Sequence, residues 1–472
     1  MKLDPKEVNF IIEEVLKKLT DSKAISSGTK HTGTGIYDTM DNAIEAAYNA
    51  QKELVKLGVM KRKEIIEQIR RVMRTHVKFM ADAAVAETGM GRVDHKINKN
   101  LLAIDKTPGV EDLSSTAYTG DRGLALVEMA PYGLIGSITP STNSTETIIN
   151  NSISMISAGN SVVFGPHPAA KGVSQKAVEL INGAIQSVGG PVDLVTTVTE
   201  PSIEASQTLM KHPKVKLLVV TGGPAVVDLA MKSGKKVIAA GPGNPPVLVD
   251  ESADIPAAAR DIILGAGLDN NIVCIAEKEI FALKKIADHL KSEMCRQGAF
   301  ELSSRDLEKL MEQIISGKDH HGFPMPNRKF VGRNASVIAN SIGLRIPEET
   351  KILIAEVPPS HPLVMMEQLM PVIPFSRFDS FDDALSWSLK AEHGFYHTSA
   401  MHSRDVEHLS LMASVVNTTI FVKNAPTYAG LGMGGEGHTT FTIASPTGEG
   451  ITSARTFTRQ RRCTLVDYFR II

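Results

Sequence analysis

Short β-rich apolar runs alternate with amphipathic stretches over most of this chain. From residue 134 the apolar runs are LIGSITP, SVVFGP, VDLVTTV, KLLVVTGG and KKVIAAGPG, and helical patterns lie near 143–158, 169–187, 201–212 and 224–232. This alternation predicts a parallel sheet with crossover helices. Such sheets bind ligands at the carboxyl ends of their strands. We therefore expect ligand contacts in the loops 139–143, 165–168, 221–224 and 241–246.

A second α/β pattern begins after residue 250. Helical patterns near 252–268, 286–297 and 303–316 are interspersed with the β-rich runs EIFAL, ILIAEVP, VIPFSRF, TSAMHS and TTIFVKN. Upstream of the first sheet, helices are predicted at 41–57 and 61–88, and the run GLALVEMAP at 123–131 is typical of one strand of a projecting hairpin. A chain of 472 residues is too long for one ordinary core, so two or three domains are expected.

The N-terminal residues form a separate pattern. Residues 4–19 have the signals of an amphipathic helix: Asp4 suits the cap, Pro5 the first helical position, and Glu7 completes a capping box. The polar, glycine-rich stretch 20–35 has the composition of a flexible linker. A helix this short is marginal alone, so its apolar stripe needs either a groove on a partner or the body of its own chain. The mixed charges of its polar face disfavour a membrane surface.

Composition limits the classes of function. Hydrophobic residues make up 42% and charged residues 22%, as in globular proteins, and a net charge of −1 argues against a nucleic-acid partner. The three cysteines are an odd number and form no CxxC pair, which argues against a disulfide framework or a zinc knuckle and favours a reducing, cytoplasmic compartment. No apolar run approaches the roughly 20 residues that span a bilayer, and the N-terminus has no signal-peptide core.

The stretch GAGLDNNIVCIAE at 265–277 contains Cys274, the strongest candidate for chemistry. A thiol needs little help to attack a carbonyl carbon, although on this stretch alone a buried cysteine acting as a small hydrophobe is the favoured interpretation. Three histidines in EHGFYHTSAMHS could suggest a metal, but no acidic residue has zinc-like spacing around them, so no metal site is predicted.

The order of motifs resembles the aldehyde dehydrogenase superfamily, in particular its CoA-acylating branch and the ethanolamine- or propanediol-utilisation enzymes of bacterial microcompartments. The motifs are ITPSTNSTET, VVFGPHPAAK, VVTGGPA, AAGPGNPP, LDNNIVCIAE, MEQLMPVIPF, EHGFYHTSAMHS and ARTFTRQRRC, from about residue 36 onward. The resemblance implies an α/β fold with two Rossmann-like parallel-sheet domains and a small β oligomerisation flap. The implied parts are an encapsulation peptide at 1–19, a linker at 20–35, an NAD-binding domain at 36–246 with a flap hairpin near 120–131, a catalytic domain at 247–445, and an oligomerisation strand within 446–472.

The resemblance also assigns catalytic roles. Cys274 is implied as the nucleophile and Asn143 as the oxyanion donor, although Asn143 also stands where a helix cap is expected, at the start of 143–158. Hydrolytic members carry a glutamate base in an E-L-G-G motif. The matching turn here, 240–243, reads AGPG and has no carboxylate. Because water is a poor nucleophile without a base, the missing glutamate favours CoA as acyl acceptor. The alternatives are a hydrolytic dehydrogenase and a catalytically silent nucleotide-binding protein.

The remaining implied site residues concern the cofactor. The nicotinamide ribose is placed near Glu367, and the other implied contacts are Thr139, Pro140, Thr142, His167, Pro168, Thr221, Gly222, Gly223 and Gly241. Hydrolytic members hold the adenosine ribose with a lysine near position 165, where this chain has Gly-Pro-His-Pro. NAD is favoured, with NADP left open, and CoA is the implied co-substrate. The resemblance further implies a short-chain aldehyde such as acetaldehyde or propionaldehyde, a dimer or tetramer, and encapsulation in a cytoplasmic microcompartment through residues 1–19.

Overall fold

The computed structural model describes residues 33–472 apart from 319–321 and 323. The helix predicted at 4–19 and most of the linker predicted at 20–35 lie outside the described residues. No helix in the described part of the chain is long and apolar enough to cross a membrane.

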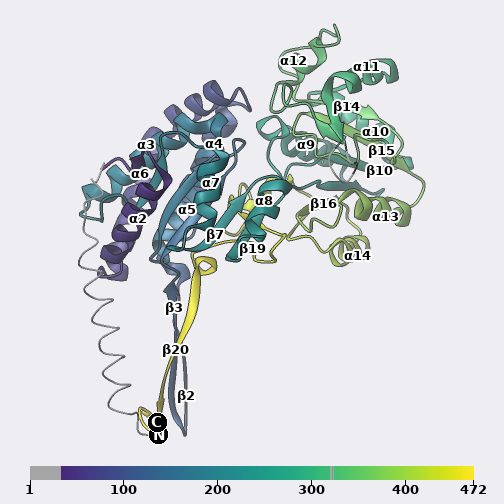
Figure 1. Cartoon of the computed structure of the whole chain (residues 1–472). Helices are drawn as coiled ribbons and strands as arrows, with labels where there is room; N and C mark the ends of the chain where they lie inside the picture. Colours follow the sequence, from purple (N-terminus) through teal and green to yellow (C-terminus); the bar gives the residue numbers. More distant parts are fainter. Residues whose placement is uncertain (1–32, 319–321, 323) are drawn as a thin grey trace, which may run out of the picture.

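The first domain is built around a six-stranded sheet of parallel strands, as the alternating pattern predicts (Figure 1). Its order is β1 (Ile36–Tyr37), β6 (Val195–Val198), β5 (Ser161–Pro166), β4 (Leu134–Thr139), β7 (Val215–Thr221) and β8 (Lys236–Ala240). From β4 the chain order runs outward to both sides, so the topological switch point lies between β4 and β7. In an open parallel sheet this point is where ligands bind.

Helices cover both faces of this sheet, and their bounds are α2 (Met40–Leu54), α3 (Val59–Thr88), α4 (Val93–Lys106), α5 (Ser144–Ser157), α6 (Lys171–Ser187), α7 (Ile203–Lys211) and α8 (Pro224–Met231). Gly89 ends α3 in the left-handed conformation, at φ 68°, as expected of a C-terminal glycine. Helix α4 has no counterpart among the sequence-based predictions. Short 3-10 turns, η1 (Val110–Asp112) and η2 (Pro168–Ala170), complete the connections.

The second domain contains seven parallel strands in the order β11 (Ala299–Glu301), β14 (Ile352–Glu356), β15 (Val372–Phe378), β10 (Glu279–Leu283), β9 (Pro246–Val249), β16 (Thr398–His402) and β17 (Ile420–Lys423). Its helices are α9 (Ile255–Ala266), α10 (Lys284–Arg296), α11 (Ser304–Ile314), α12 (Ala335–Asn340), α13 (Phe381–Ala391) and α14 (Val406–Val416), and β12 (Ile315–Lys318) pairs with β13 (Pro324–Pro326). The chain then returns to the first domain, where Phe441 N donates to Asn150 Oδ1 at 3.1 Å and Ala239 N donates to Thr447 Oγ1 at 3.0 Å.

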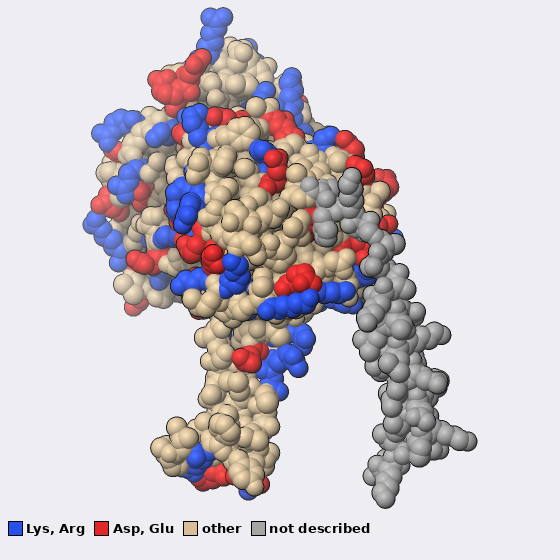
Figure 2. All heavy atoms as spheres, turned by 90° about the vertical axis from the view of Figure 1, so that its left-hand side faces the viewer, with Lys and Arg blue, Asp and Glu red and all other residues tan. Residues whose placement is uncertain are grey.

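A three-stranded antiparallel arm projects from the first domain (Figure 1). It consists of β2 (Thr116–Gly120), β3 (Gly123–Pro131) and the C-terminal β20 (Thr458–Val466), and β3 lies between the other two. The family resemblance implies that the hairpin and the tail form one flap, and the pairing of β3 with both β2 and β20 confirms that prediction. On the face shown in Figure 2 the arm carries few charged side chains.

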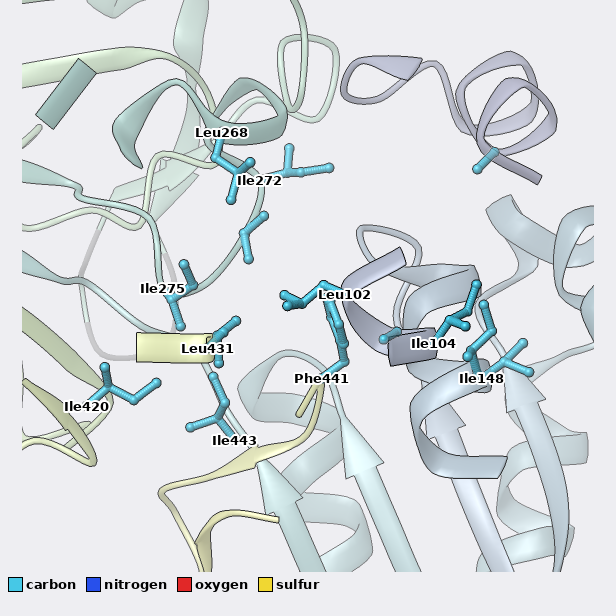
Figure 3. Packing of buried hydrophobic residues seen from close by; sticks show 14 of the residues in the cluster. Leu102, Ile104, Ile148, Leu268, Ile272, Ile275, Ile420, Leu431, Phe441 and Ile443 are labelled. Carbon is cyan, nitrogen blue, oxygen red and sulfur yellow. The ribbon is translucent and has the colours of Figure 1, made fainter. Parts of the chain in front are cut away.

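One buried apolar cluster runs through both domains. It extends from Ile104 and Ile148 of the first domain through Leu102 and Phe441 to Ile275, next to Cys274 (Figure 3). The return segment contributes Leu431 in η4 (Thr427–Leu431) and Ile443 in β18 (Ile443–Ala444), which pairs with β19 (Gly450–Ile451) and precedes η5 (Ala454–Phe457). Close-packed interiors have low compressibility. This cluster therefore holds the Cys274 loop in a fixed position against the first domain.

Candidate active site

The loop before Cys274 has an unusual backbone that explains its two asparagines. In η3 (Leu268–Asn271) the residues Asp269, Asn270 and Asn271 all have positive φ, at 49°, 56° and 65°. Asp and Asn tolerate this region better than other non-glycine residues. Each asparagine side chain also anchors the loop: Asn270 Nδ2 donates to Gly332 O at 2.8 Å, and Asn271 Nδ2 donates to Ala266 O at 2.8 Å.

Lys278 holds the loop from the other side. Its fully buried ammonium donates to the Asn271 carbonyl and Oδ1, both at 2.7 Å, and to the Val273 carbonyl at 3.2 Å. Burial lowers the pKa of Lys278 to about 8, and the nearby carboxylate of Glu367 opposes that shift. The backbone on the N-terminal side of Cys274 is therefore fixed by charge-assisted hydrogen bonds.

Cys274 is partly exposed at the end of this loop, whereas the other two cysteines are exposed elsewhere. Burial, with a smaller contribution from the charge of Glu367, raises the pKa of the Cys274 thiol to about 12. Lys278, the Cys274 backbone N–H and Lys99 act in the opposite direction. In the ligand-free protein the sulfur is therefore a thiol, and its reactivity depends on the charges around it.

Asn143 occupies the N-cap position of α5, but its side chain makes no cap hydrogen bond. The expectation that it caps the helix is therefore wrong. Instead, Asn143 Oδ1 accepts a hydrogen bond from Lys99 Nζ at 2.7 Å. Lys99 is buried on α4 and also pairs with Asp269 of the Cys274 loop at 2.6 Å. The structure thus connects Asn143 and the Cys274 loop through Lys99, a residue absent from the sequence-based predictions.

The turn after β8 lies directly over the cysteine. A Cβ on Gly243 would stand 2.6 Å from the Cys274 carbonyl oxygen and 3.0 Å from His397 Cγ, so only glycine fits there. His397 is fully buried, its Nδ1 lies 2.9 Å from Thr398 Oγ1, and its Nε2 has no partner among the described residues. Burial, aided by Lys278, lowers the pKa of His397 to about 4. A neutral imidazole therefore stands beside the turn in which hydrolytic relatives are expected to carry a glutamate.

In the sequence, His397 stands out only as one of three histidines that could bind a metal. Its neighbour in that motif, His402, is also buried, and burial lowers its pKa to about 4. Within the described ranges, no three His, Cys, Asp or Glu side chains are arranged to hold a metal ion. One signal could have identified His397: it immediately precedes β16. Strand β16 pairs with β9, the strand that follows the glycine turn.

The residues proposed for the cofactor lie at one edge of the first sheet. Thr139 ends β4 and is followed by Pro140 and Thr142, and Thr221 ends β7 and is followed by Gly222 and Gly223. The loop after β5 contributes His167 and Pro168, and the loop after β8 contributes Gly241. The four strands are neighbours in the order β5-β4-β7-β8. The edge fits a dinucleotide: Thr139 Oγ1 is buried without a partner in the described part of the chain, and a Cβ on Gly223, the N-cap of α8, would meet no atom within 4 Å.

Glu367 comes from the second domain, in the loop between β14 and β15. Its Oε1 accepts a hydrogen bond from Gly243 N at 3.2 Å. Burial raises the pKa of Glu367, while Lys278 and the Gly243 N–H partly offset that effect. The carboxyl group therefore stands on the glycine turn, close enough to the thiol to influence its ionisation.

Comparisons with known proteins agree with this arrangement. The sequence is 48% identical to an acetylating acetaldehyde dehydrogenase of Salmonella typhimurium, over all of both chains. A Rhodopseudomonas palustris propionaldehyde dehydrogenase, solved with bound CoA and an acylated cysteine, superposes with a TM-score of 0.89 at 48% identity, covering 92% of this chain and 98% of that one. A propionaldehyde dehydrogenase from a fucose-utilisation microcompartment of Clostridium phytofermentans gives a TM-score of 0.90 at 47% identity, covering 93% and 100%. The sequence model of the aldehyde dehydrogenase family matches residues 27–303, and the chain belongs to that family.

Proposed function

We propose that this protein oxidises a short-chain aldehyde to its CoA thioester, with NAD as hydride acceptor and Cys274 as the acyl carrier. The observation that carries the proposal is the surroundings of Cys274. The loop that carries the thiol is joined to the oxyanion candidate Asn143 through Asp269 and Lys99, and residues 240–243 of the glycine turn over it include no acidic side chain. The relatives named above, an acetylating enzyme and one with CoA and an acylated cysteine, support the same acyl acceptor.

The first half of the reaction forms a thioester on the cysteine. The Cys274 thiol loses its proton to solvent, the resulting thiolate adds to the aldehyde carbon, a C–S bond forms, and the carbonyl oxygen becomes an oxyanion. Asn143 Nδ2 and the Cys274 backbone N–H are the donors for that oxygen, and fixed donors of this kind supply a large share of catalysis in acyl transfer. NAD, when bound at the sheet edge, supplies the acceptor for the hydride.

The second half transfers the acyl group. The CoA sulfur attacks the thioester carbon, the bond to Cys274 Sγ breaks, and the CoA thiol loses its proton. We assign His397 as the acceptor of that proton. With Nδ1–H donating to Thr398 Oγ1, its Nε2 carries a lone pair that no described residue occupies. A carboxylate that could activate water in place of CoA is absent from residues 240–243.

The decisive experiment measures NADH formation from acetaldehyde and propionaldehyde with and without CoA, together with the product. Acyl-CoA as product and a strong CoA requirement in steady state support the proposal. A free carboxylate formed at the same rate without CoA would identify a hydrolytic dehydrogenase. Absence of turnover in the wild-type protein, with nucleotide binding retained, would identify a silent binding protein. Comparing kcat/KM for two- to four-carbon aldehydes, and for NAD against NADP, would define the substrates.

We also propose that the arm makes the protein a dimer or a tetramer. Its tip and tail expose apolar side chains, including Tyr118, Tyr468, Phe469, Ile471 and Ile472, the last two more than 90% exposed. Exposed apolar groups gathered on one projection are typical of an interface. Deleting residues 465–472 should lower the mass measured by light scattering, whereas Ile203→Ser, at an exposed apolar position on α7 away from the arm, should leave it unchanged. An unchanged mass after the deletion would refute this role of the tail.

Residues 1–19 are proposed to direct the enzyme into a bacterial microcompartment. The support is the amphipathic pattern in the sequence and the microcompartment origin of the Clostridium phytofermentans relative. Deleting these residues should leave kcat and KM unchanged in vitro and abolish co-localisation of a fluorescent fusion with a labelled shell. Retained co-localisation would reject the encapsulation role.

A further inference from the structure

We propose that Lys99 is a positioning residue that fixes the orientation of the Asn143 carboxamide and joins it to the Cys274 loop. The proposal rests on the proposed function in one respect, the use of Asn143 as an oxyanion donor. It concerns a residue that touches neither the aldehyde nor the cofactor in the mechanism above.

The chemistry of the contact determines which way the carboxamide faces. A lysine ammonium has three donors and no acceptor. The Asn143 atom that lies 2.7 Å from Lys99 Nζ must therefore be the oxygen, Oδ1. Nδ2 is then directed elsewhere, and it donates to no residue that the structure describes. An asparagine without this neighbour could turn its oxygen toward the substrate, where it would repel a developing oxyanion.

Lys99 is itself held rigidly by two acids. Its Nζ lies 2.6 Å from Asp269 Oδ2 and 3.1 Å from Glu146 Oε1, and all three side chains are at most 1% exposed. Burial alone would lower the pKa of Lys99, but Asp269 and Glu146 outweigh it and raise that pKa. The ammonium is therefore charged at neutral pH and cannot turn away without leaving a buried carboxylate unpaired, which is costly.

The same network reaches the nucleophile. Asp269 precedes Cys274 by five residues, and its Oδ1 accepts from Arg92 N at 2.7 Å while its Oδ2 also pairs with Lys96 at 3.0 Å. Burial would raise the pKa of Asp269, but Lys99 and Lys96 outweigh it and lower that pKa. Helix α4 therefore holds the oxyanion donor on α5 and the cysteine loop of the second domain through one charged cluster.

Helix α4 also provides a matched control. Lys96 and Lys99 are equally buried, lie one turn apart, and pair with the same oxygen of Asp269. Lys99 contacts Asn143, whereas the other partner of Lys96 is the Thr142 carbonyl, at 3.2 Å. Replacing either lysine with a neutral residue removes one of the two positive charges that pair with Asp269. Only the loss of Lys99 frees the carboxamide.

The test compares Lys99→Met and Lys96→Met in the wild-type and Asn143→Ala backgrounds. The readout is the rate of the first-turnover NADH burst without CoA, which reports the step at which the oxyanion forms. Removing one oxyanion donor costs about 10²–10³-fold. Lys99→Met should therefore slow the burst by about 10- to 100-fold with KM for NAD unchanged, and Lys96→Met should slow it several-fold less. In the Asn143→Ala background, Lys99→Met should slow the burst by less than about threefold.

Lys99 also lowers the pKa of the Cys274 thiol, so the iodoacetamide alkylation rate of each variant is measured in parallel and used to correct the burst rate. Two outcomes would overturn the proposal. In one, Lys99→Met lowers the corrected burst rate by the same factor in the wild-type and Asn143→Ala backgrounds. In the other, Lys99→Met and Lys96→Met lower it by the same factor. Should Lys99→Met not fold, the neutral and similarly sized Lys99→Gln takes its place in the same cycle. Because the burst precedes acyl transfer, this result is independent of whether CoA or water is the acceptor. A missing burst in the wild type would contradict both proposals.

Discussion

Gly243 and Glu367 meet across the two domains: the glycine N–H donates to Oε1 of the glutamate at 3.2 Å. The same glycine is packed against the Cys274 carbonyl on its other side. One residue of the turn therefore contacts both the acid proposed to bind the nicotinamide ribose and the backbone of the nucleophile. Any displacement of this turn should affect cofactor binding and thiol geometry together.

The first prediction concerns that turn. In Gly243→Ala, the new Cβ would lie 2.6 Å from a backbone oxygen, so the turn or the cysteine loop must move. A displacement of about 1 Å in an active site can cost about 10²-fold in rate, and we expect a loss of that order in kcat/KM. The control is Gly183→Ala in α6, where a Cβ meets nothing within 4 Å. Equal activity of the two variants would contradict the close packing over Cys274.

The second prediction concerns the ionisation of Cys274. The charge of Glu367 raises the pKa of the thiol, so Glu367→Gln should lower that pKa. A lower thiol pKa means more thiolate at a given pH, and alkylation of the ligand-free protein by iodoacetamide at pH 8 should become faster. The same substitution should raise KM for NAD. The exposed Glu349→Gln serves as the control, and an unchanged alkylation profile in Glu367→Gln would refute the electrostatic effect.

The third prediction separates the two half-reactions. His397→Asn removes the base assigned to the CoA thiol, so steady-state turnover with CoA should fall by about 10²-fold or more. The NADH burst without CoA should keep its amplitude, because acylation of Cys274 does not use that base. His393→Asn is a matched control, since His393 has φ 61° and asparagine tolerates that conformation. A burst lost in parallel with turnover would place His397 in the first half-reaction instead.

Sequence patterns predicted the parts of this protein that depend on local periodicity and motif order. Except for β1, β9 and β11, the strands of both parallel sheets were predicted, as were the strand at 123–131 and the loops at the carboxyl edge of β4, β5, β7 and β8. The pairing of that strand with the tail was implied by the family resemblance. In such sheets the strands are buried on both faces and appear as continuous apolar runs, as in β5. Register and pairing order are determined by long-range packing, and they became visible only in the structure.

The charged cluster could not be predicted for a different reason. Lys96, Lys99 and Asn100 lie on the buried face of α4, at positions where a periodicity analysis expects apolar residues. Lysines at such spacing indicate a solvated face unless their partners are known. The partners are Asp269 and Glu146, which are distant in sequence and come from other elements. The misassigned role of Asn143 as a helix cap has the same origin, because Lys99 takes the atom that would have made the cap.

The last prediction concerns stability and pH. Glu277 is fully buried, and its two oxygens accept from Thr427 N and Thr427 Oγ1, both at 2.9 Å. Burial raises its pKa from 4.5 to about 7, despite the opposing hydrogen bonds from Thr427. The folded protein therefore binds this proton more tightly than the unfolded chain does. The resulting stabilisation is complete below pH 4.5 and is lost as pH rises through 7.

Glu277→Gln should remove this dependence, because its amide reproduces the protonated acid: the oxygen can accept from Thr427 N–H and Nε2 can donate to Thr427 Oγ1. The variant should match the wild type in free energy of unfolding near pH 4.5 and exceed it by about 3 kcal/mol above pH 7.5. Urea titrations at half-unit steps between pH 4.5 and 8 measure the difference, with Glu349→Gln as the exposed control. A difference that stays constant with pH, or grows toward acid, would show that Glu277 is ionised in the folded protein at pH 5–6.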